Sequence, residues 1–278
     1  MPDTIGSRRR KTINALKDAA GDDAALEARL LMCGALGCDE LELLFKEKEI
    51  IDTDAEEKLD ALVERRLGGE PIQYILGEWE FMGLAFTVRE GVLIPRQDTE
   101  TLAEEAIRRI KRLGGGRVLD MCCGTGCIGI SIAKYAGAEA TLCDISDECL
   151  KLAAENAEKN GVSARIIKSD LFDGVDEKFD MIVCNPPYIR SGDISALQRE
   201  VRREPLLALD GGVDGLNFYR RIKKDFKKRL TRGGTLMLEI GFDQAADICA
   251  IFGHAEIIKD ICGNDRVAAI DTKEDSDA

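Results

Sequence analysis

Apolar residues in the first 70 positions recur at the three- and four-residue spacing that places side chains on one helix face. Three stretches show this spacing, represented by Leu26, Leu30 and Leu31, by Leu41, Leu44 and Phe45, and by Leu59, Leu62 and Val63. Glycine and aspartate residues between the stretches supply helix breaks and N-cap residues. The pattern predicts a small helical bundle over residues 1–70.

A different pattern follows the bundle. From Gln73 to Val88, apolar and aromatic residues alternate around two glycines, which is typical of a β-hairpin. Residues 71–96 are therefore expected to form a hairpin connector between two domains. Directly after this connector, Asp98 or Thr99 is expected to cap a helix.

From Arg117 onward, short apolar runs alternate with helical stretches. Strands are expected at 118–121, 140–144, 164–168, 180–184, 235–240, 255–259 and 266–270, and helices at 128–135, 147–160, 216–230 and 244–252. This alternation predicts an α/β fold with a doubly wound, mostly parallel sheet in a domain spanning residues 97–278. The ligands of such a sheet bind at the carboxyl ends of its strands.

The amino-acid composition and the net charge argue against several classes of protein. The 278-residue chain is 45% apolar and 33% charged, as in globular proteins, and no window approaches the length of a membrane span. No signal-peptide pattern opens it, so we expect a cytoplasmic protein without a membrane partner. The net charge of −13 argues against direct binding to a nucleic-acid backbone.

Ten cysteines raise the question of a metal site or disulfides. They show no paired C-x-x-C spacing, and the single histidine, His254, lies far from them in the sequence. Several lie in apolar strands, where a reduced cysteine behaves as a small apolar residue. We interpret them as reduced core residues and expect no metal.

A glycine-bearing loop joins the first strand of the α/β domain to its first helix. The loop consists of Cys122, Cys123, Gly124, Thr125 and Gly126. It lacks both the Lys-Ser/Thr pair of a phosphate-binding P-loop and the three glycines of a dinucleotide fingerprint. Asp144 ends the second strand, where a carboxylate can accept hydrogen bonds from ribose hydroxyls. Strand, loop and acid together predict a nucleoside site.

The tetrapeptide Asn185-Pro186-Pro187-Tyr188 follows a buried strand. Its two prolines keep the backbone extended and cannot donate to a sheet ladder, so they form a stiff elbow. A rigid turn that closes the strand is one interpretation. The other is chemical, because Asn185 and the carbonyl of Pro186 could accept both N–H groups of a planar nitrogen, with Tyr188 packed over the group.

The sequence shows no signature of a nucleophilic catalyst or a metal centre, which favours a cofactor that brings its own reactive group. No Ser-His or Cys-His nucleophile system is evident with one histidine, and no ligand cluster suggests a metal. S-adenosylmethionine fits such a site, because its sulfonium methyl is already electrophilic. The protein then needs only to orient a nucleophile and accept its protons.

The glycine-bearing loop, Asp144 and the tetrapeptide together resemble class I methyltransferases that act on planar nitrogens. Five segments are similar to the HemK/PrmC family of peptide chain release factor glutamine methyltransferases: Gly69–Ile72, Leu93–Glu100, Asn185–Ile189, Val201–Pro205 and Gly263–Arg266. The resemblance covers essentially the whole chain. It implies methyl transfer from S-adenosylmethionine, leaving S-adenosylhomocysteine, to the side-chain amide of the Gln in the Gly-Gly-Gln motif of release factors 1 and 2.

The same resemblance implies roles for particular residues. Asn185, Pro186, Pro187 and Tyr188 would be the catalytic and substrate-binding residues. The cofactor would be bound by Cys122, Cys123, Gly124, Thr125, Gly126, Asp144, Leu171 and Asn185, with Leu171 flanking the adenine. The helical domain would dock the release factor, and we expect the enzyme to be a monomer.

Two positions depart from the family pattern. Cys122 stands where members usually have Gly, and Gln97 stands where they usually have Pro. Because a positive φ at a cysteine would cost about 1 kcal/mol or more, an ordinary extended backbone is predicted at Cys122. Gln97 puts only the rigidity of its own segment in question.

Two other functions remain to be weighed. Methyltransferases of adenine or guanine amino groups in DNA or RNA use the same tetrapeptide, but the acidic balance and the N-terminal helical domain speak against this function. A nucleotide-sensing protein with a vestigial methyltransferase fold is the third possibility. The intact loop, Asp144 and Asn185 speak against it.

Overall fold

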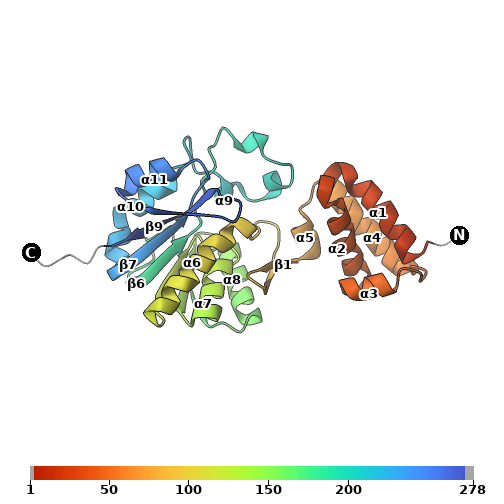
Figure 1. Ribbon diagram of the computed structural model, residues 1–278, viewed down its shortest axis with the longest axis horizontal. Helices are drawn as coiled ribbons and strands as arrows, with labels where there is room; N and C mark the ends of the chain where they lie inside the picture. Colours follow the sequence, from red (N-terminus) through yellow and green to blue (C-terminus); the bar gives the residue numbers. More distant parts are fainter. Residues whose placement is uncertain (1–2, 273–278) are drawn as a thin grey trace, which may run out of the picture. The chain divides into compact units, whose positions relative to one another are not determined.

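The computed structural model describes residues 3–272. The chain forms two compact units, shown in Figure 1. The smaller comprises Met1–Gly77 and Gln198–Arg203, and the larger comprises Glu78–Leu197 and Glu204–Ala278. Each has a core of its own, so each is described by itself.

The smaller unit is helical, as predicted. Its helices are α1 (Ile5–Ala20), α2 (Ala24–Leu36), α3 (Glu40–Phe45), α4 (Thr53–Leu67) and α5 (Ile72–Leu76), with a 3-10 turn η1 (Gly21–Asp23). Leu16, Leu31 and Leu59, from three different helices, are fully buried against one another's helices. Asp39 and Asp52 accept backbone N–H bonds at the starts of α3 and α4, as N-cap residues do.

Helix α5 corrects the predicted start of the hairpin. The first residues of the expected alternation, from Gln73, are helical, because Pro71 precedes a spacing of Ile72, Ile75 and Leu76 that also fits a helix. The hairpin itself is confirmed as β1 (Glu78–Phe81) and β2 (Leu84–Thr87), which pair antiparallel.

A return segment, Gln198–Arg203, completes the smaller unit. Arg66 is buried, and its guanidinium contacts Glu27 at 2.7 Å and Glu200 of this segment at 2.8 Å. Arg199 donates to the carbonyl of Gly68. The segment is therefore held to the helical bundle by the buried guanidinium of Arg66 and by a hydrogen bond to the end of α4.

The larger unit contains the predicted sheet. Its strands are β3 (Arg117–Met121), β4 (Glu139–Asp144), β5 (Ala164–Lys168), β6 (Phe179–Cys184), β7 (Leu230–Glu239), β8 (Glu256–Lys259) and β9 (Asp265–Asp271). Their order is β5-β4-β3-β6-β7-β9-β8, parallel from β5 to β7 and antiparallel at β9 and β8. The mostly parallel, doubly wound sheet is confirmed. Chain order reverses between β3 and β6, which makes their carboxyl ends the expected ligand site.

Helices cover both faces of this sheet (Figure 1). Successive side chains of each strand point to opposite faces of the sheet. Met181 and Val183 of β6 pack on one face with α6 (Gln97–Leu113), α7 (Cys127–Ala136) and α8 (Asp147–Lys159). Ile182 and Cys184 pack with α10 (Asn217–Arg229) and α11 (Ala245–Phe252) on the other face. Between β6 and α10 lie η2 (Ile194–Ala196), η3 (Val201–Arg203) and α9 (Leu206–Leu209).

The predicted cap of α6 is wrong. The helix begins at Gln97 after Arg96, and no side chain caps it. Asp98 and Thr99 therefore lie within its first turn, where their side chains take other partners. Asp98 pairs with Arg266 of β9, and Thr99 accepts a hydrogen bond from Asn185.

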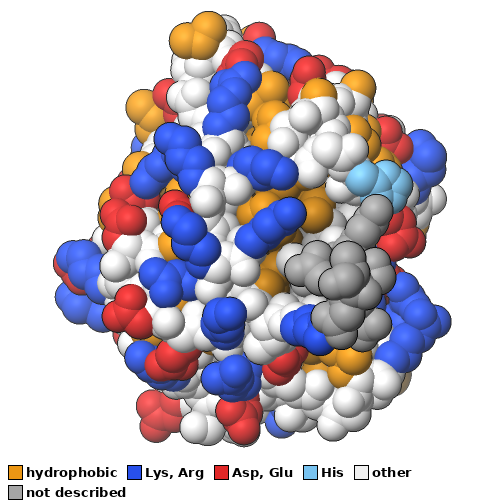
Figure 2. Space-filling model, turned by 90° about the vertical axis from the view of Figure 1, so that its left-hand side faces the viewer, with side chains coloured by type: hydrophobic (Ala, Val, Ile, Leu, Met, Phe, Trp, Pro, Cys, Tyr) orange, Lys and Arg blue, Asp and Glu red, His pale blue; other side chains and the backbone are white. Residues whose placement is uncertain are grey.

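One face of the larger unit is locally basic although the chain is acidic. Figure 2, seen from the side of α10 and α11, shows Lys and Arg side chains gathered together. Helix α10 of this unit is rich in basic residues, and three of them, Arg220, Arg221 and Lys228, pair with Asp214, Asp170 and Asp225. No helix within residues 3–272 is long and apolar enough to cross a membrane.

Candidate active site

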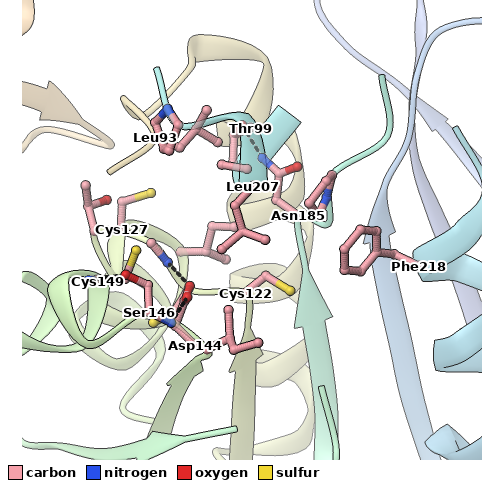
Figure 3. A pocket seen from close by; sticks show the side chains of 18 of the residues that line it. Leu93, Thr99, Cys122, Cys127, Asp144, Ser146, Cys149, Asn185, Leu207 and Phe218 are labelled. Carbon is pink, nitrogen blue, oxygen red and sulfur yellow. Dashed lines mark hydrogen bonds between the residues drawn. The ribbon is translucent and has the colours of Figure 1, made fainter. Parts of the chain in front are cut away.

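A cavity of about 350 Å³ lies at the carboxyl ends of β3, β4 and β6 (Figure 3). The residues predicted from sequence that line it are Cys122, Cys123, Gly124, Thr125, Asp144, Leu171, Asn185 and Pro187. Of the predicted residues in the described chain, Gly126, Pro186 and Tyr188 do not line it. The loop after β3, the end of β4 and the end of β6 thus meet at one cavity.

Asp144 organises the side of the cavity formed by β3 and β4. Its Oδ2 accepts the N–H of Gly124 at 3.0 Å, and its Oδ1 accepts the N–H of Ser146 at 2.9 Å. Each carboxylate oxygen keeps a further lone pair, because a carboxylate accepts about four hydrogen bonds. Asp144 can therefore hold the loop and still accept a ligand hydroxyl.

The backbone at Cys122 contradicts the predicted extended conformation. Its φ is +59°, and Leu171, which also lines the cavity, has a φ of +53°. Within residues 3–272, only one other non-glycine residue, Met82 in the hairpin turn, has a positive φ. The N–H of Cys123 continues the ladder with β4 by donating to the carbonyl of Cys143 at 3.0 Å, and the loop then turns, since the N–H of Gly126 donates to the carbonyl of Cys123 at 2.8 Å. Left-handed backbone at two wall residues is strain of the kind found at functional sites.

Gly126 acts beneath the cavity wall. Its φ is +80°, and a Cβ there would lie 2.9 Å from Ile130. A side chain at this position would be strained by the positive φ and crowded by Ile130 of α7, Leu142 of β4 and Ala153 of α8. Three residues along, the N–H of Gly129 donates to Asp120 at 2.8 Å, which ties the start of α7 to the end of β3.

Asp120 is fully buried, and burial raises the pKa of its carboxyl to about 7. Its Oδ1 has no hydrogen-bond partner in the described part of the chain. A buried carboxylate with an unpaired oxygen favours its protonated form.

Asn185 follows β6 directly and presents its side-chain amide to the cavity. Its Nδ2 donates to Oγ1 of Thr99 at 3.3 Å, a bond drawn in Figure 3. The Oδ1 atom is the other end of the amide and has no donor among the described residues. It is available to accept a hydrogen bond from a ligand.

Tyr188 points away from the cavity. Its hydroxyl donates to Oε1 of Glu239 at 3.2 Å, and burial raises the pKa of the phenol. Glu239 ends β7 and is 1% exposed. Burial raises the pKa of its carboxyl to about 7, against the lowering effects of the Thr99 hydroxyl, Arg266 and Tyr188.

Thr99 and Glu239 were missed by the sequence reasoning as residues of the site. The signal for Glu239 was the one used for Asp144, an acid that ends a buried strand. Thr99 was interpreted as a helix cap, which hid its contact with the tetrapeptide.

An ion pair between the buried Glu204 and the partly exposed Arg96 lies at the cavity wall that contains Ile94 and Arg96. Glu204 accepts the N–H of Ile94 at 3.0 Å and pairs with Arg96. Burial raises the pKa of Glu204, and the charge of Arg96 opposes that shift. Ile94 and Arg96 line the cavity, so this pair joins two of the segments that carried the family resemblance.

Four cysteines line the cavity, Cys122, Cys123, Cys127 and Cys149. Burial raises the pKa of Cys127 and of Cys149 to about 12, so both remain protonated thiols at neutral pH. They contribute apolar surface. Within residues 3–272, no group of three or more His, Cys, Asp or Glu residues could hold a metal ion.

Comparisons with known proteins agree with this geometry. Residues 9–77 match the PrmC N-terminal domain family, and residues 99–204 match the methyltransferase small domain family. A crystal structure of a methyltransferase from Pyrococcus furiosus has a TM-score of 0.52 at 16% identity, covering 78% of this chain and 98% of that chain. This likeness shows the fold.

Two relatives extend over most of the chain. The release factor glutamine methyltransferase of Agrobacterium fabrum is 39% identical over 276 residues, which cover 95% of this chain and 94% of that protein. That of Geobacter sulfurreducens is 42% identical, covering 86% of this chain and 84% of that protein. The chain therefore belongs to the release factor glutamine methyltransferase family.

Proposed function

We propose that this chain transfers the methyl group of S-adenosylmethionine to the side-chain amide nitrogen of the Gln in the Gly-Gly-Gln motif of peptide chain release factors 1 and 2. One observation carries the proposal beyond family membership. Asn185 and Pro187 share a single cavity with the loop residues 122–125 and with Asp144. Residues suited to a nucleoside and residues suited to a planar nitrogen therefore meet.

The wall formed by β3 and β4 fits the cofactor. Asp144 has lone pairs left for ribose hydroxyls, and Leu171 offers an apolar side chain suited to the adenine. The cavity volume of about 350 Å³ lies within the range of small-molecule sites. When bound, S-adenosylmethionine supplies an electrophilic methyl group.

Asn185 and Pro186 have the task of binding the substrate amide. An amide nitrogen is a poor nucleophile, because its lone pair is delocalised into the carbonyl. Oδ1 of Asn185 and the carbonyl oxygen of Pro186 would accept its two N–H bonds and hold the nitrogen in place. Electron density returns to the nitrogen as those bonds strengthen in the transition state. Pro186 and Pro187 keep both acceptors rigid.

The helical unit, residues 1–70 by the sequence, would dock the release factor. A folded substrate needs contacts beyond the glutamine side chain that enters the cavity. Helix α3 exposes Leu41, Leu44 and Phe45, with Phe45 at 87% exposure. Adjacent exposed apolar residues on one short helix favour protein contact over solvent.

We propose that the macromolecular partner is the release factor protein and not a nucleic acid. The net charge of the chain is −13, and on the basic helix α10 three side chains, Arg220, Arg221 and Lys228, pair with acidic neighbours, which reduces the charge available to a phosphate backbone. We further propose that the enzyme is a cytoplasmic monomer that needs no metal.

Methylation with labelled cofactor tests the substrate class. Purified protein would be incubated with unmethylated release factor, DNA and ribosomal RNA in separate reactions. Label is expected in the release factor. Label that appears only in DNA or RNA would overturn the proposal.

A further inference from the structure

The Gly263–Arg266 segment carried part of the family resemblance, but the proposed chemistry does not use it. The segment lies in the turn between β8 and β9 and runs into β9, where Arg266 is buried. Within the described chain, Arg266 is not among the residues that line the cavity. The contacts of this buried cation with the rest of the protein therefore decide what it can act on.

Asp260 fixes the direction of the Arg266 guanidinium. Its Oδ2 accepts hydrogen bonds from Nη2 of Arg266 at 3.2 Å and from Nε at 3.3 Å. The other oxygen, Oδ1, accepts the backbone N–H groups of Cys262 and Asn264 at 2.9 Å each. Asp260 is itself buried. The carboxylate is thus tied to its own turn, and the guanidinium is held to it by two charge-assisted bonds.

The same guanidinium contacts the first turn of α6. Nη2 of Arg266 lies 3.0 Å from Oδ2 of Asp98. Because no side chain caps the start of α6, this ion pair is one of the contacts that anchor that turn. The next residue, Thr99, accepts a hydrogen bond from Nδ2 of Asn185 at 3.3 Å. The side chain of Arg266 is therefore connected to the first residue of the tetrapeptide through two neighbouring residues of α6.

The backbone at Arg266 is connected to the last residue of the tetrapeptide. The carbonyl of Arg266 accepts the N–H of Ile240 at 2.9 Å, and the next residue of β9, Val267, pairs with Glu239 of β7. Oε1 of Glu239 accepts the hydroxyl of Tyr188 at 3.2 Å. Both ends of the tetrapeptide are thus reached from Arg266, one through α6 and the other through β7.

We propose that Arg266 is a positioning residue that holds the tetrapeptide in place through Asp98 of α6 and through the end of β7. The inference rests on the proposed function, because the groups that it holds are those that would bind the substrate amide. Catalysis by positioning is sensitive to small displacements of such groups. A loosened first turn of α6 should therefore lower kcat more than it lowers the affinity for the cofactor.

A second ion pair joins α6 to β9 and offers a matched control. Nη1 of Arg109 lies 3.2 Å from Oδ1 of Asp271. The side chains of Asp98 and Asp271 are similarly exposed, at 51% and 60%. Asp98 directly precedes Thr99, whereas Arg109 lies toward the C-terminal end of α6. The two pairs join the same elements, and one of them is next to the contact with Asn185.

Asp98→Asn and Asp271→Asn test the proposal together. Each keeps the size of the side chain and removes one charge of an α6–β9 ion pair. For Asp98→Asn, kcat with full-length release factor should fall about fivefold, since an ion pair with a partly exposed partner contributes modestly. Its calorimetric affinity for S-adenosylmethionine should stay within about twofold of wild type. Asp271→Asn should keep both quantities within about twofold of wild type.

A double-mutant cycle separates positioning from a general loss of packing. In an Asn185→Ala background, Asp98→Asn should lower kcat by less than about twofold, because the group that it positions is absent. A fall as large as that seen with Asn185 present would show that Asp98 acts on something else, and the positioning role would be wrong.

Substitution of Arg266 tests the same connection from β9. Arg266→Lys keeps the charge but loses the planar fork that reaches Asp98 and Asp260 together, and kcat should fall about tenfold. Adding Asp98→Asn to it should lower kcat little further, because both changes break one connection. Since Arg266 is buried, this variant could fail to fold, in which case the comparison of Asp98→Asn with Asp271→Asn still decides.

The outcomes distinguish this inference from the proposed function. If wild-type protein does not methylate release factor, the proposed function is wrong and the inference falls with it. If wild type is active and Asp98→Asn retains its kcat, or loses no more than Asp271→Asn does, the positioning role is wrong while the proposed function stands.

Discussion

The backbone N–H of Gly124 donates to Oδ2 of Asp144 over 3.0 Å and so joins the loop after β3 to the last residue of β4. The other oxygen of Asp144 holds the N–H of Ser146. One side chain therefore sets the shape of the proposed cofactor wall and faces the cavity at the same time.

Replacing Asp144 by Ala should weaken S-adenosylmethionine binding at least tenfold. The variant loses a charged acceptor for two backbone N–H groups and for the ribose, and each such bond contributes about 1.5–3 kcal/mol. Calorimetric titration measures the loss. Asp147→Ala, at the exposed start of α8, is the matched control and should bind as wild type does. Equal affinities of the two variants would refute the role of Asp144.

Asn185→Ala should fold and bind S-adenosylmethionine but lose roughly 10²-fold in turnover, as when one transition-state hydrogen-bonding group is deleted. Steady-state kinetics with release factor measure the loss, and calorimetry checks the cofactor site. Near-normal turnover in this variant would remove Asn185 from the mechanism.

The left-handed backbone at Cys122 should affect the stability of variants at this position. Because φ there is +59°, Cys122→Gly should be about 1 kcal/mol more stable than Cys122→Ala. Cys33, inside α2, gives the opposite control, since Ala is favoured over Gly in a helix by about 1 kcal/mol. Urea unfolding of the four variants measures both differences. The same order at both positions would contradict a strained Cys122.

Stability should also depend on the buried carboxyls. The pKa of Asp120 is raised from 3.8 to about 7, so between these values the folded chain keeps a proton that the unfolded chain has lost. Stability due to Asp120 therefore falls as pH rises through this window, by about 1.4 kcal/mol per pH unit at most. Glu239, raised from 4.5 to about 7, acts in the same direction.

Asp120→Asn removes this dependence at one site. The difference in unfolding free energy between the variant and wild type should shift in favour of the variant as pH rises from 5 to 7. Urea unfolding across that range measures it. A difference that stays constant with pH would show that Asp120 is ionised throughout.

Docking of the release factor should depend on α3. Phe45→Ser is expected to lower kcat/KM for full-length release factor about tenfold, because burial of a large apolar side chain contributes about 1.5–3 kcal/mol. Turnover of a short Gly-Gly-Gln peptide should be unaffected. Ile261→Ser, equally exposed at 87% but in the larger unit, is the matched control. Loss of activity with both substrates would point to misfolding.

Much of the fold could be predicted from the sequence, because strand and helix periods are local. The strands β3 to β6 begin and end within a residue of their predicted bounds. The predictions failed where tertiary contacts override local preference. Cys122 adopts a left-handed backbone that its type disfavours, and the alternation at Gln73 also fitted a helix.

The candidate site shows the same division. The loop residues 122–125, Asp144 and Asn185 were placed at one cavity by the rule for parallel sheets. Thr99 accepts a hydrogen bond from Asn185, and Glu239 accepts one from Tyr188. Both lie far from the tetrapeptide in sequence and reach it only because α6 and β7 pack beside β6. No local sequence pattern predicts these contacts, which became visible only in the three-dimensional structure.

The most direct test of the central claim is mass spectrometry of the Gly-Gly-Gln peptide of a release factor incubated with this protein and S-adenosylmethionine. Fragmentation should place one added methyl group on the glutamine side chain with wild-type protein, and almost none with Asn185→Ala. An unmodified glutamine in the wild-type reaction, or a methyl group on another residue, would contradict the account.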